Sequence, residues 1–360
     1  MTATGNRTRA VGATERAMTV RTTGVSSATL LSARHLRAAY VGERGDVTCA
    51  VDDVDLTVAA GEVLGIAGES GCGKSTLAAV LSLTTRPPLY VQGGELSVAG
   101  RRVSLDPDHR PPRSWCGAAV SLLPQGALNS LSPTIRIGNV AVDVLRSHVH
   151  GIRRAEALDR AADRLEQLHL PRRVLRAYPH QLSGGMRQRV VTVLSTLLDP
   201  ELLIADEPTS ALDVSTQQVM LDMLREMLHR ELVRGIIFVT HDLPVLRAIA
   251  DRIAIMYAGQ IVEVGRTEDI INRPRHPYTA ALLASVLVPE PHVRSRRILG
   301  IPGAPPDLQK PPAGCRFHPR CALATEVCAI MHPPVVGDER RYARCWWASA
   351  HPDDFVTARV

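Results

Sequence analysis

The sequence contains no uninterrupted apolar run long enough to cross a bilayer as a helix, which takes about 18 residues. The two longest candidates, residues 190–207 and 235–246, are interrupted by Asp199 and Asp242. The start of the chain also lacks the apolar core of a secretory signal. We therefore expect a chain that does not cross a membrane by itself.

Lysine is almost absent, because Lys74 and Lys310 are the only two in 360 residues. Arginine carries the net charge of +6, and six arginines lie in the first 37 residues beside a single acid, Glu15. That segment is rich in Ser, Thr, Ala and Gly without periodicity, a composition typical of disorder. We expect residues 1–30 to form a disordered tail, and we expect no nucleic-acid partner.

Internal repeats are also absent, and residues 31–265 alternate short apolar runs with longer stretches of helical character. The runs at 62–68, 202–206 and 235–240 are of the kind that is buried in a parallel sheet. Each run leads into a segment able to form a helix. This pattern predicts an α/β fold with a parallel-sheet core.

Two regions depart from that alternation. Five apolar side chains recur at helical spacing within the first: Ala155, Leu158, Ala162, Leu165 and Leu168. Charged residues stand between them, so we expect an inserted helical subdomain at about 126–182. After residue 265 proline becomes dense and cysteines appear. This change predicts a small, loop-rich, cysteine-containing C-terminal domain at 266–360.

The segment "GIAGESGCGKST" follows a predicted strand and has the spacing G-x-x-x-x-G-K-[ST]. Its candidate nucleotide-binding residues are Gly68, Gly71, Gly73, Lys74, Ser75 and Thr76. Glycines let backbone N–H groups approach phosphate oxygens, and a helix N-terminus adds partial positive charge. Lys74 would reach the β- and γ-phosphates, and the Ser75 hydroxyl would bind Mg²⁺. A glycine-rich turn with an incidental lysine is the alternative, and the order strand, loop, helix argues against it.

A second segment, "LLIADEPTSALD", places two acids directly after an apolar strand. Asp206 would lie at the carboxyl edge of the sheet, where it can hold Mg²⁺. Glu207 would polarise a water for in-line attack on the γ-phosphate. The pair could instead merely cap a helix, but its presence beside a phosphate loop favours catalysis of ATP hydrolysis.

The segment "YPHQLSGGMRQR" at 178–189 resembles the signature of ATP-binding-cassette (ABC) ATPases. Ser183, Gly184 and Gly185 precede a predicted helix, which provides a second helix N-terminus suited to phosphate. The resemblance implies that residues 31–265 form an ABC nucleotide-binding domain. It also implies that two ATPase subunits face each other, so that these three residues contact ATP held by the phosphate loop of the partner.

Further positions match this family one by one. The resemblance implies that His241 is the switch residue that contacts the γ-phosphate, and that Gln125 links Mg²⁺ and the attacking water to the helical insert. It likewise implies that Asp213 connects the two sites across the dimer and that Tyr40 stacks on adenine.

Several segments narrow the resemblance to the ATPase subunits of dipeptide, oligopeptide and nickel importers, over residues 31–346. They are "NSLSP", "LSGGMRQR", "RHPYTAALLASV", "IPGAPPDL" and "GCRFHPRC". The resemblance implies a peripheral ATPase at the cytoplasmic face of the membrane that powers import through a separate permease. A soluble ABC ATPase of DNA repair or translation is the alternative, but the long coiled-coil insertion or second cassette of such proteins is absent.

The resemblance also implies the partners. They are a second ATPase subunit, related but not identical, two transmembrane permease subunits and an extracytoplasmic substrate-binding protein. The helical insert between Gln125 and Ser183 would contact the permease.

Four of the seven cysteines lie in the last fifty residues: Cys315, Cys321, Cys328 and Cys345. A helix continuing from Pro319 would separate the second and third by about 10 Å, beyond the roughly 7 Å that a disulfide allows between Cα atoms. Zinc prefers tighter spacings, although His318 offers a C-x2-H pair. Some of these importer ATPases carry a 4Fe-4S cluster at such a motif, so the resemblance implies a cluster, with Zn²⁺ or free thiols as alternatives.

Overall fold

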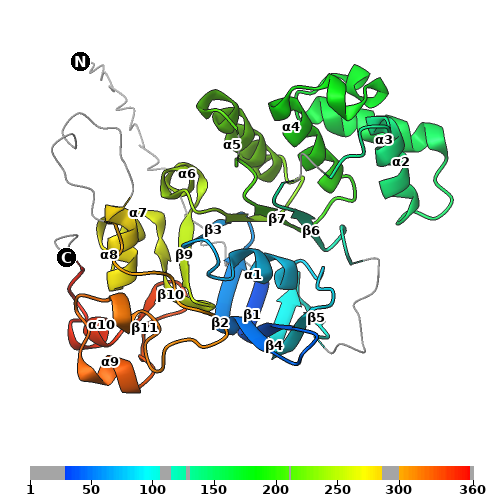
Figure 1. Ribbon diagram of the computed structural model, residues 1–360. Helices are drawn as coiled ribbons and strands as arrows, with labels where there is room; N and C mark the ends of the chain where they lie inside the picture. Colours follow the sequence, from blue (N-terminus) through cyan, green and yellow to red (C-terminus); the bar gives the residue numbers. More distant parts are fainter. Residues whose placement is uncertain (1–28, 106–114, 127–129, 211, 286–299, 357–360) are drawn as a thin grey trace, which may run out of the picture.

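The computed structural model describes residues 29–105, 115–126, 130–210, 212–285 and 300–356. The predicted tail at 1–30 therefore falls outside the described residues, apart from Thr29 and Leu30, which begin a strand. The described chain forms two sheets with helices around them (Figure 1).

The larger sheet has eight strands in the order β11-β12-β10-β9-β3-β8-β7-β6. They are β3 (Val63–Ala67), β6 (Val120–Leu123), β7 (Leu202–Asp206), β8 (Gly235–Val239), β9 (Arg252–Tyr257), β10 (Gln260–Arg266), β11 (Val335–Gly337) and β12 (Tyr342–Arg344). The five strands from β9 to β6 in this order pair in parallel. The predicted parallel-sheet core is confirmed.

Both faces of this core are covered, which explains the apolar runs in the sequence. Along β8, Ile236 and Phe238 pack into one hydrophobic cluster, and Ile237 and Val239 pack into the other. Successive side chains of a strand point to opposite faces, so a strand buried on both sides has no polar alternation.

The second sheet is antiparallel, and the sequence did not predict it. Its order is β2-β1-β4-β5, with β1 (Thr29–Val41), β2 (Val47–Ala59), β4 (Leu89–Val98) and β5 (Arg101–Val103). Together with α1 (Lys74–Leu81) it encloses one of the two clusters over the larger sheet.

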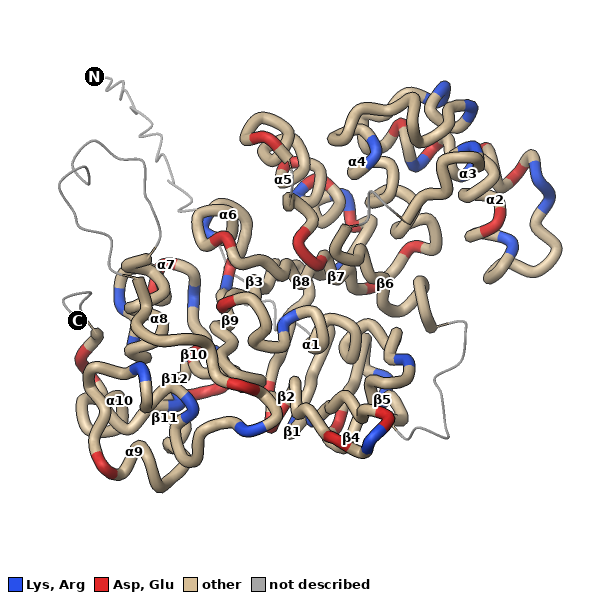
Figure 2. The backbone as a smooth tube through the Cα atoms, viewed as in Figure 1, with Lys and Arg blue, Asp and Glu red and all other residues tan. Residues whose placement is uncertain are grey.

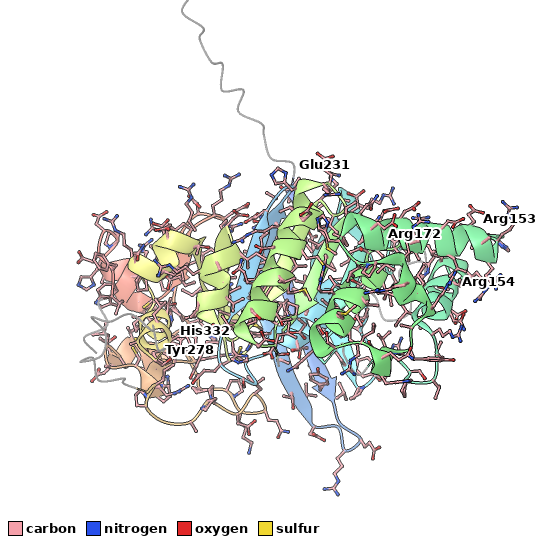
Figure 3. The ribbon with its side chains drawn as sticks, turned by 90° about the horizontal axis from the view of Figure 1, so that it is seen from above. Arg153, Arg154, Arg172, Glu231, Tyr278 and His332 are labelled. Atoms are coloured by element: carbon pink, nitrogen blue, oxygen red, sulfur yellow. The ribbon has the colours of Figure 1, made fainter. Side chains whose placement is uncertain are left out.

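The predicted helical insert is present. It contains α2 (Ile137–Arg146), α3 (Arg154–Gln167) and the 3-10 helices η2 (Arg172–Arg176) and η3 (Pro179–Gln181), followed by α4 (Gly184–Ser195). Figure 1 shows α2, α3 and α4 together at one end of the molecule, and Figure 3 shows Arg153 and Arg154 at the outer end of this part.

The predicted apolar stripe of α3 is correct only in part. Ala162, Leu165 and Leu168 are buried and Leu158 is partly buried, as expected. Ala155 is exposed, whereas Ala157 and Ala161, which were not predicted, are buried. Alanine is only weakly apolar and stands on several faces of this helix, so composition alone could not select the buried ones.

The remaining helices are α5 (Val214–His229), α6 (Leu243–Ile249), α7 (Thr267–Asn272), α8 (Pro277–Ala284), η5 (His318–Arg320), α9 (Glu326–Ile330) and α10 (Trp346–Ala350). None of the helices in the described ranges combines the length and apolarity needed to span a bilayer.

The C-terminal region is joined to both sheets. Strands β12 and β11 extend the larger sheet beyond β10. The Arg344 guanidinium pairs with Asp53 of β2 at 3.1 Å, and Tyr342 donates a hydrogen bond to the Asp55 carbonyl at 3.2 Å. Figure 2 shows acidic positions of β2 near basic positions beside β11 and β12.

Candidate functional site

Four loops bring the predicted nucleotide site together. They follow β3, β8, β7 and β6, which are consecutive neighbours in the sheet. Since parallel strands end at the same edge, the phosphate loop, His241, the Asp206–Glu207 pair and Gln125 all emerge at one carboxyl edge. Ligands of open α/β sheets bind at such an edge.

The phosphate loop has glycines where the backbone leaves no room for a side chain. A Cβ on Gly68 would lie 2.1 Å from the Met256 carbonyl oxygen, and one on Gly73 would lie 2.1 Å from that of Ala50. Gly71 has a φ of +80° but open space around it. The predicted glycines are therefore required by packing and conformation here, besides any approach to phosphate.

Lys74 lies at the start of α1 with its ammonium turned into the loop. Its Nζ donates to the carbonyl oxygens of Gly68 at 2.8 Å and Glu69 at 2.9 Å. Thr76 is buried, and its hydroxyl lies 3.1 Å from the hydroxyl of Tyr40 on β1. Tyr40 itself is partly exposed beside the helix that follows the loop.

Glu207 connects two loops through one carboxylate. Its Oε1 lies 2.9 Å from His241 Nδ1, and its Oε2 accepts a hydrogen bond from Gln125 Nε2 at 3.2 Å. The backbone of Glu207 has a φ of 49° and is held by its N–H, which donates to the Val239 carbonyl at 2.8 Å. Such left-handed strain in a non-glycine residue concentrates at functional sites. The three predicted catalytic residues therefore lie together.

Asp206 carries a buried oxygen with no partner. Its Oδ1 has no hydrogen bond in the described structure. Burial raises the pKa of Asp206, and a hydrogen bond from Ser75 partly offsets this. A buried carboxylate oxygen without a donor is suited to a hard cation such as Mg²⁺. Asp206 and Ser75 therefore fit the predicted metal role.

The signature residues form a separate group with Asp213. Ser183 caps α4 by accepting a hydrogen bond from the Met186 N–H at 3.3 Å. Asp213 caps α5 by accepting from the Thr216 N–H at 3.0 Å, and its pKa is lowered by hydrogen bonds from Ser215 and Thr216. Within the described ranges, no hydrogen bond or ion pair joins this group to the phosphate loop.

Two family models match the chain. One describes the ABC transporter and matches residues 51–210, and the other describes the oligopeptide/dipeptide transporter C-terminal region and matches residues 262–328. The oligopeptide transport ATP-binding protein OppD of Salmonella typhimurium is 41% identical over 321 residues, which cover 88% of this chain and 93% of that protein. The chain belongs to this family of ABC transporter ATP-binding proteins.

A second relative and a solved structure support the same family and fold for this ABC ATPase. The probable D,D-dipeptide transport ATP-binding protein DdpD of Escherichia coli is 39% identical, over 88% of this chain and 96% of that protein. Among solved structures, the dimeric ABC transporter cassette MJ0796 has a TM-score of 0.56 and 25% identity, over 66% of this chain and 98% of that one. The α/β P-loop ABC ATPase fold predicted from the sequence is thereby confirmed.

The C-terminal cysteines gather around one small cavity of about 10 Å³. Its lining includes Cys315, Cys321, Cys328 and Cys345. All four are free thiols, and burial raises the pKa of Cys321 to about 11 and that of Cys345 to about 12. No group of three or more His, Cys, Asp or Glu side chains in the described ranges is arranged to hold a metal ion. The structure therefore does not support the expected 4Fe-4S cluster.

The continuous helix expected from Pro319 is also wrong. The chain forms η5 at His318–Arg320, turns, and begins α9 only at Glu326. The distance argument against a disulfide between Cys321 and Cys328 rested on that helix and loses its basis. Proline permits a helix start but does not extend the helix through the following turn.

Two contacts at the site were missed by sequence reasoning. Gly185 of the signature lies against Thr216 of α5, and Glu69 of the phosphate loop pairs with Arg320. Each pair joins residues far apart in the chain. The position of Arg320 between two cysteines of the C-terminal motif marked it as a residue of interest. No nearby sequence pattern indicated that its partner is Glu69.

Proposed function

We propose that this ABC ATPase hydrolyses ATP to drive the uptake of oligopeptides or dipeptides through separate permease subunits. Its relatives are named as transport ATP-binding proteins for such peptides, at about 40% identity over most of the chain. The observation that carries the proposal is the shared carboxylate of Glu207, hydrogen-bonded to both His241 and Gln125 at the sheet edge that also bears the phosphate loop.

In this proposal the loop N–H groups from Gly71 to Ser75 and the Lys74 ammonium bind the phosphates. Mg²⁺ would be held by Ser75, Gln125 and Asp206, where it would neutralise charge developing on the phosphoryl oxygens. The unpartnered Asp206 oxygen supports this assignment.

Glu207 is the proposed general base. Its carboxylate orients the attacking water and accepts the proton, while His241 holds the carboxylate in place and contacts the γ-phosphate. Tyr40 would flank the adenine, consistent with its position beside α1.

The second half of each site would come from another subunit. Within the described ranges, no hydrogen bond or ion pair joins the signature residues Ser183, Gly184 and Gly185, or Asp213, to their own phosphate loop. The solved relative MJ0796 is a dimer. We propose that a second, related ATPase subunit supplies the facing loop, and that two permease subunits and an extracytoplasmic binding protein complete the importer at the cytoplasmic face of the membrane.

The cysteine cavity is the place where the predicted 4Fe-4S cluster, or Zn²⁺, would bind. The convergence of four thiols supports this, whereas the small volume and the lack of a ligand arrangement do not. Anaerobic purification followed by iron, sulfide and zinc analysis tests it. Four irons and four sulfides per chain would establish a cluster, and metal-free protein would reject both groups.

The transport function is tested by reconstitution. The full chain is purified with the membrane proteins that accompany it, placed in liposomes and supplied with ATP inside and peptide-loaded binding protein outside. We expect peptide to accumulate only with ATP. ATP hydrolysis without peptide uptake, or copurification with no permease, would contradict the proposed function.

A further inference from the structure

The C-terminal region forms hydrogen bonds to Glu69 of the phosphate loop. The Arg320 guanidinium binds the Glu69 carboxylate through its two terminal nitrogens. Nη1 donates to Oε2 at 2.7 Å, and Nη2 donates to Oε1 at 2.9 Å. The Arg320 side chain is 6% exposed and that of Glu69 is 21% exposed. A two-point pair of this kind fixes orientation as well as distance.

The backbone of Glu69 is held at the same place. Its N–H donates to the Tyr278 hydroxyl at 2.9 Å, and its carbonyl accepts from Lys74 at 2.9 Å. Tyr278, labelled in Figure 3, belongs to α8 in the C-terminal part of the molecule. The side chain, the N–H and the carbonyl of one loop residue are thus each bound, two of them by residues after 266.

Arg320 is itself held rigidly. Its Nε donates to the Pro302 carbonyl at 2.7 Å, and its Nη1 lies 3.3 Å from the Tyr257 hydroxyl. Phe317 packs edge-on against Tyr257, with ring centroids 5.2 Å apart. Arg320 therefore cannot follow Glu69 into another conformation without breaking these contacts.

We propose that Arg320 is a positioning residue for nucleotide binding. It holds Glu69 so that the Lys74 ammonium and the loop N–H groups face the phosphates. It also neutralises a carboxylate that would otherwise repel them, because like charges a few ångströms apart interact strongly near a partly buried site. This inference rests on the proposed function and deepens it, because it assigns the C-terminal region a part in the ATP site.

The test measures ATP dissociation constants, kcat and KM for the full-length chain. We expect Arg320→Gln to weaken ATP binding by roughly tenfold, because Glu69 is left charged beside the phosphates. Arg320→Lys keeps the charge and should restore most of the affinity. In Arg320→Gln with Glu69→Gln the repelling charge is gone, so affinity should return to within about threefold of the wild type.

Arg341→Gln is the matched control, since Arg341 pairs with Asp269 on α7 and touches no phosphate-loop residue. It should leave the ATP affinity unchanged. A merely structural role for Arg320 would lower the thermal unfolding midpoint without changing the affinity, and Glu69→Gln would then rescue nothing. If the wild type binds and hydrolyses ATP, either of these results for the variants overturns the inference. A wild type that fails to bind ATP overturns the proposed function instead.

Discussion

At the scale of single residues, Glu207 combines a strained backbone with two side-chain contacts. The φ of 49° is unusual for a residue with a Cβ, and the carboxylate lies between His241 and Gln125. A residue in this conformation stays in place only because its surroundings hold it. The geometry suits a group that must keep its orientation while a water attacks.

We expect Glu207→Gln to retain ATP binding but to lose turnover by a factor of roughly 10² to 10⁴. The amide keeps the size of the side chain and can still hydrogen-bond, but it cannot accept the proton. ATP binding by equilibrium dialysis and phosphate release in the same preparation measure the two effects. Full turnover in this variant would remove Glu207 from the role of base.

The buried residues Glu263 and His276 lead us to expect that the free energy of unfolding depends on pH. The backbone N–H of His276 donates to Glu263 Oε2 at 3.0 Å, and both side chains are buried. Burial raises the pKa of Glu263 from 4.5 to about 7 and lowers the pKa of His276 from 6.5 to about 3. From pH 4.5 to 7 the folded chain keeps a proton on Glu263 that the unfolded chain has released, so this contribution to stability is lost as the pH rises. His276 acts in the opposite direction between pH 3 and 6.5.

Glu263→Gln separates the two contributions. We expect the free energy of unfolding of the wild type, relative to the variant, to fall by about 3 kcal/mol as the pH rises from 4.5 to 7. The variant alone should gain stability up to pH 6.5, because only His276 then remains of the pair. Urea unfolding at a series of pH values measures the difference. A difference independent of pH would show that Glu263 does not titrate in this range.

At the scale of helices, α4 and α5 meet at their N-termini. A Cβ on Gly185 would lie 2.3 Å from Thr216 Cγ2, while Thr216 also donates to the Asp213 carboxylate through its Oγ1 at 2.7 Å. The signature and the Asp213 cap are therefore mechanically linked. A shift of one helix start must move the other.

We expect Gly185→Ala to lower the free energy of unfolding by about 1 to 3 kcal/mol through overpacking. Adding Thr216→Ser should recover most of this, since serine lacks the clashing methyl group but keeps the hydroxyl. Gly184→Ala is the control, because a Cβ there meets nothing within 4 Å. Urea unfolding of the three variants measures the effect. Equal stability of the two alanine variants would contradict the contact.

At the scale of the whole molecule, the C-terminal region is built into the cassette. Strands β11 and β12 continue the larger sheet, Arg344 pairs with Asp53 of the antiparallel sheet, and Arg320 holds the phosphate loop. A region tied to both sheets and to the loop should unfold with them. This differs from a domain appended through a free linker.

We therefore expect one cooperative transition. Trp346 and Trp347 in α10 are two of the three tryptophans in the chain, so fluorescence reports mainly on the C-terminal region. The urea midpoint of the fluorescence transition should coincide with the midpoint measured by far-ultraviolet circular dichroism.

Arg344→Gln should lower the free energy of unfolding by about 2 kcal/mol. The urea midpoints of fluorescence and circular dichroism should therefore fall together. Arg341→Gln, which breaks a more exposed pair, should change the free energy of unfolding by less than about 1 kcal/mol. A fluorescence transition at lower urea than the dichroism would mean that the C-terminal region folds by itself.

Features that depend on residues close together in the chain could be predicted from the sequence, whereas contacts between distant segments could not. Lys74, Asp206 and Glu207 were predictable because each lies at or shortly after the carboxyl end of a buried strand, and parallel strands carry such residues to a common edge. Two details were not predictable: that Ala157 and Ala161 rather than Ala155 are buried in α3, and that the chain breaks between η5 and α9. Alanines on several sides of a helix, and a proline at a possible helix start, leave the local choice open.

The sequence by itself determined the parallel core, the loops at its carboxyl edge and the family, since these depend on apolar runs and on fixed spacings along the chain. Only the tertiary structure decided that Glu207 bonds to both Gln125 and His241, that Gly185 packs on Thr216, and that Arg320 grips Glu69 from 251 residues away. Such contacts depend on how distant segments pack, and no local pattern of residues encodes which partner a side chain will meet.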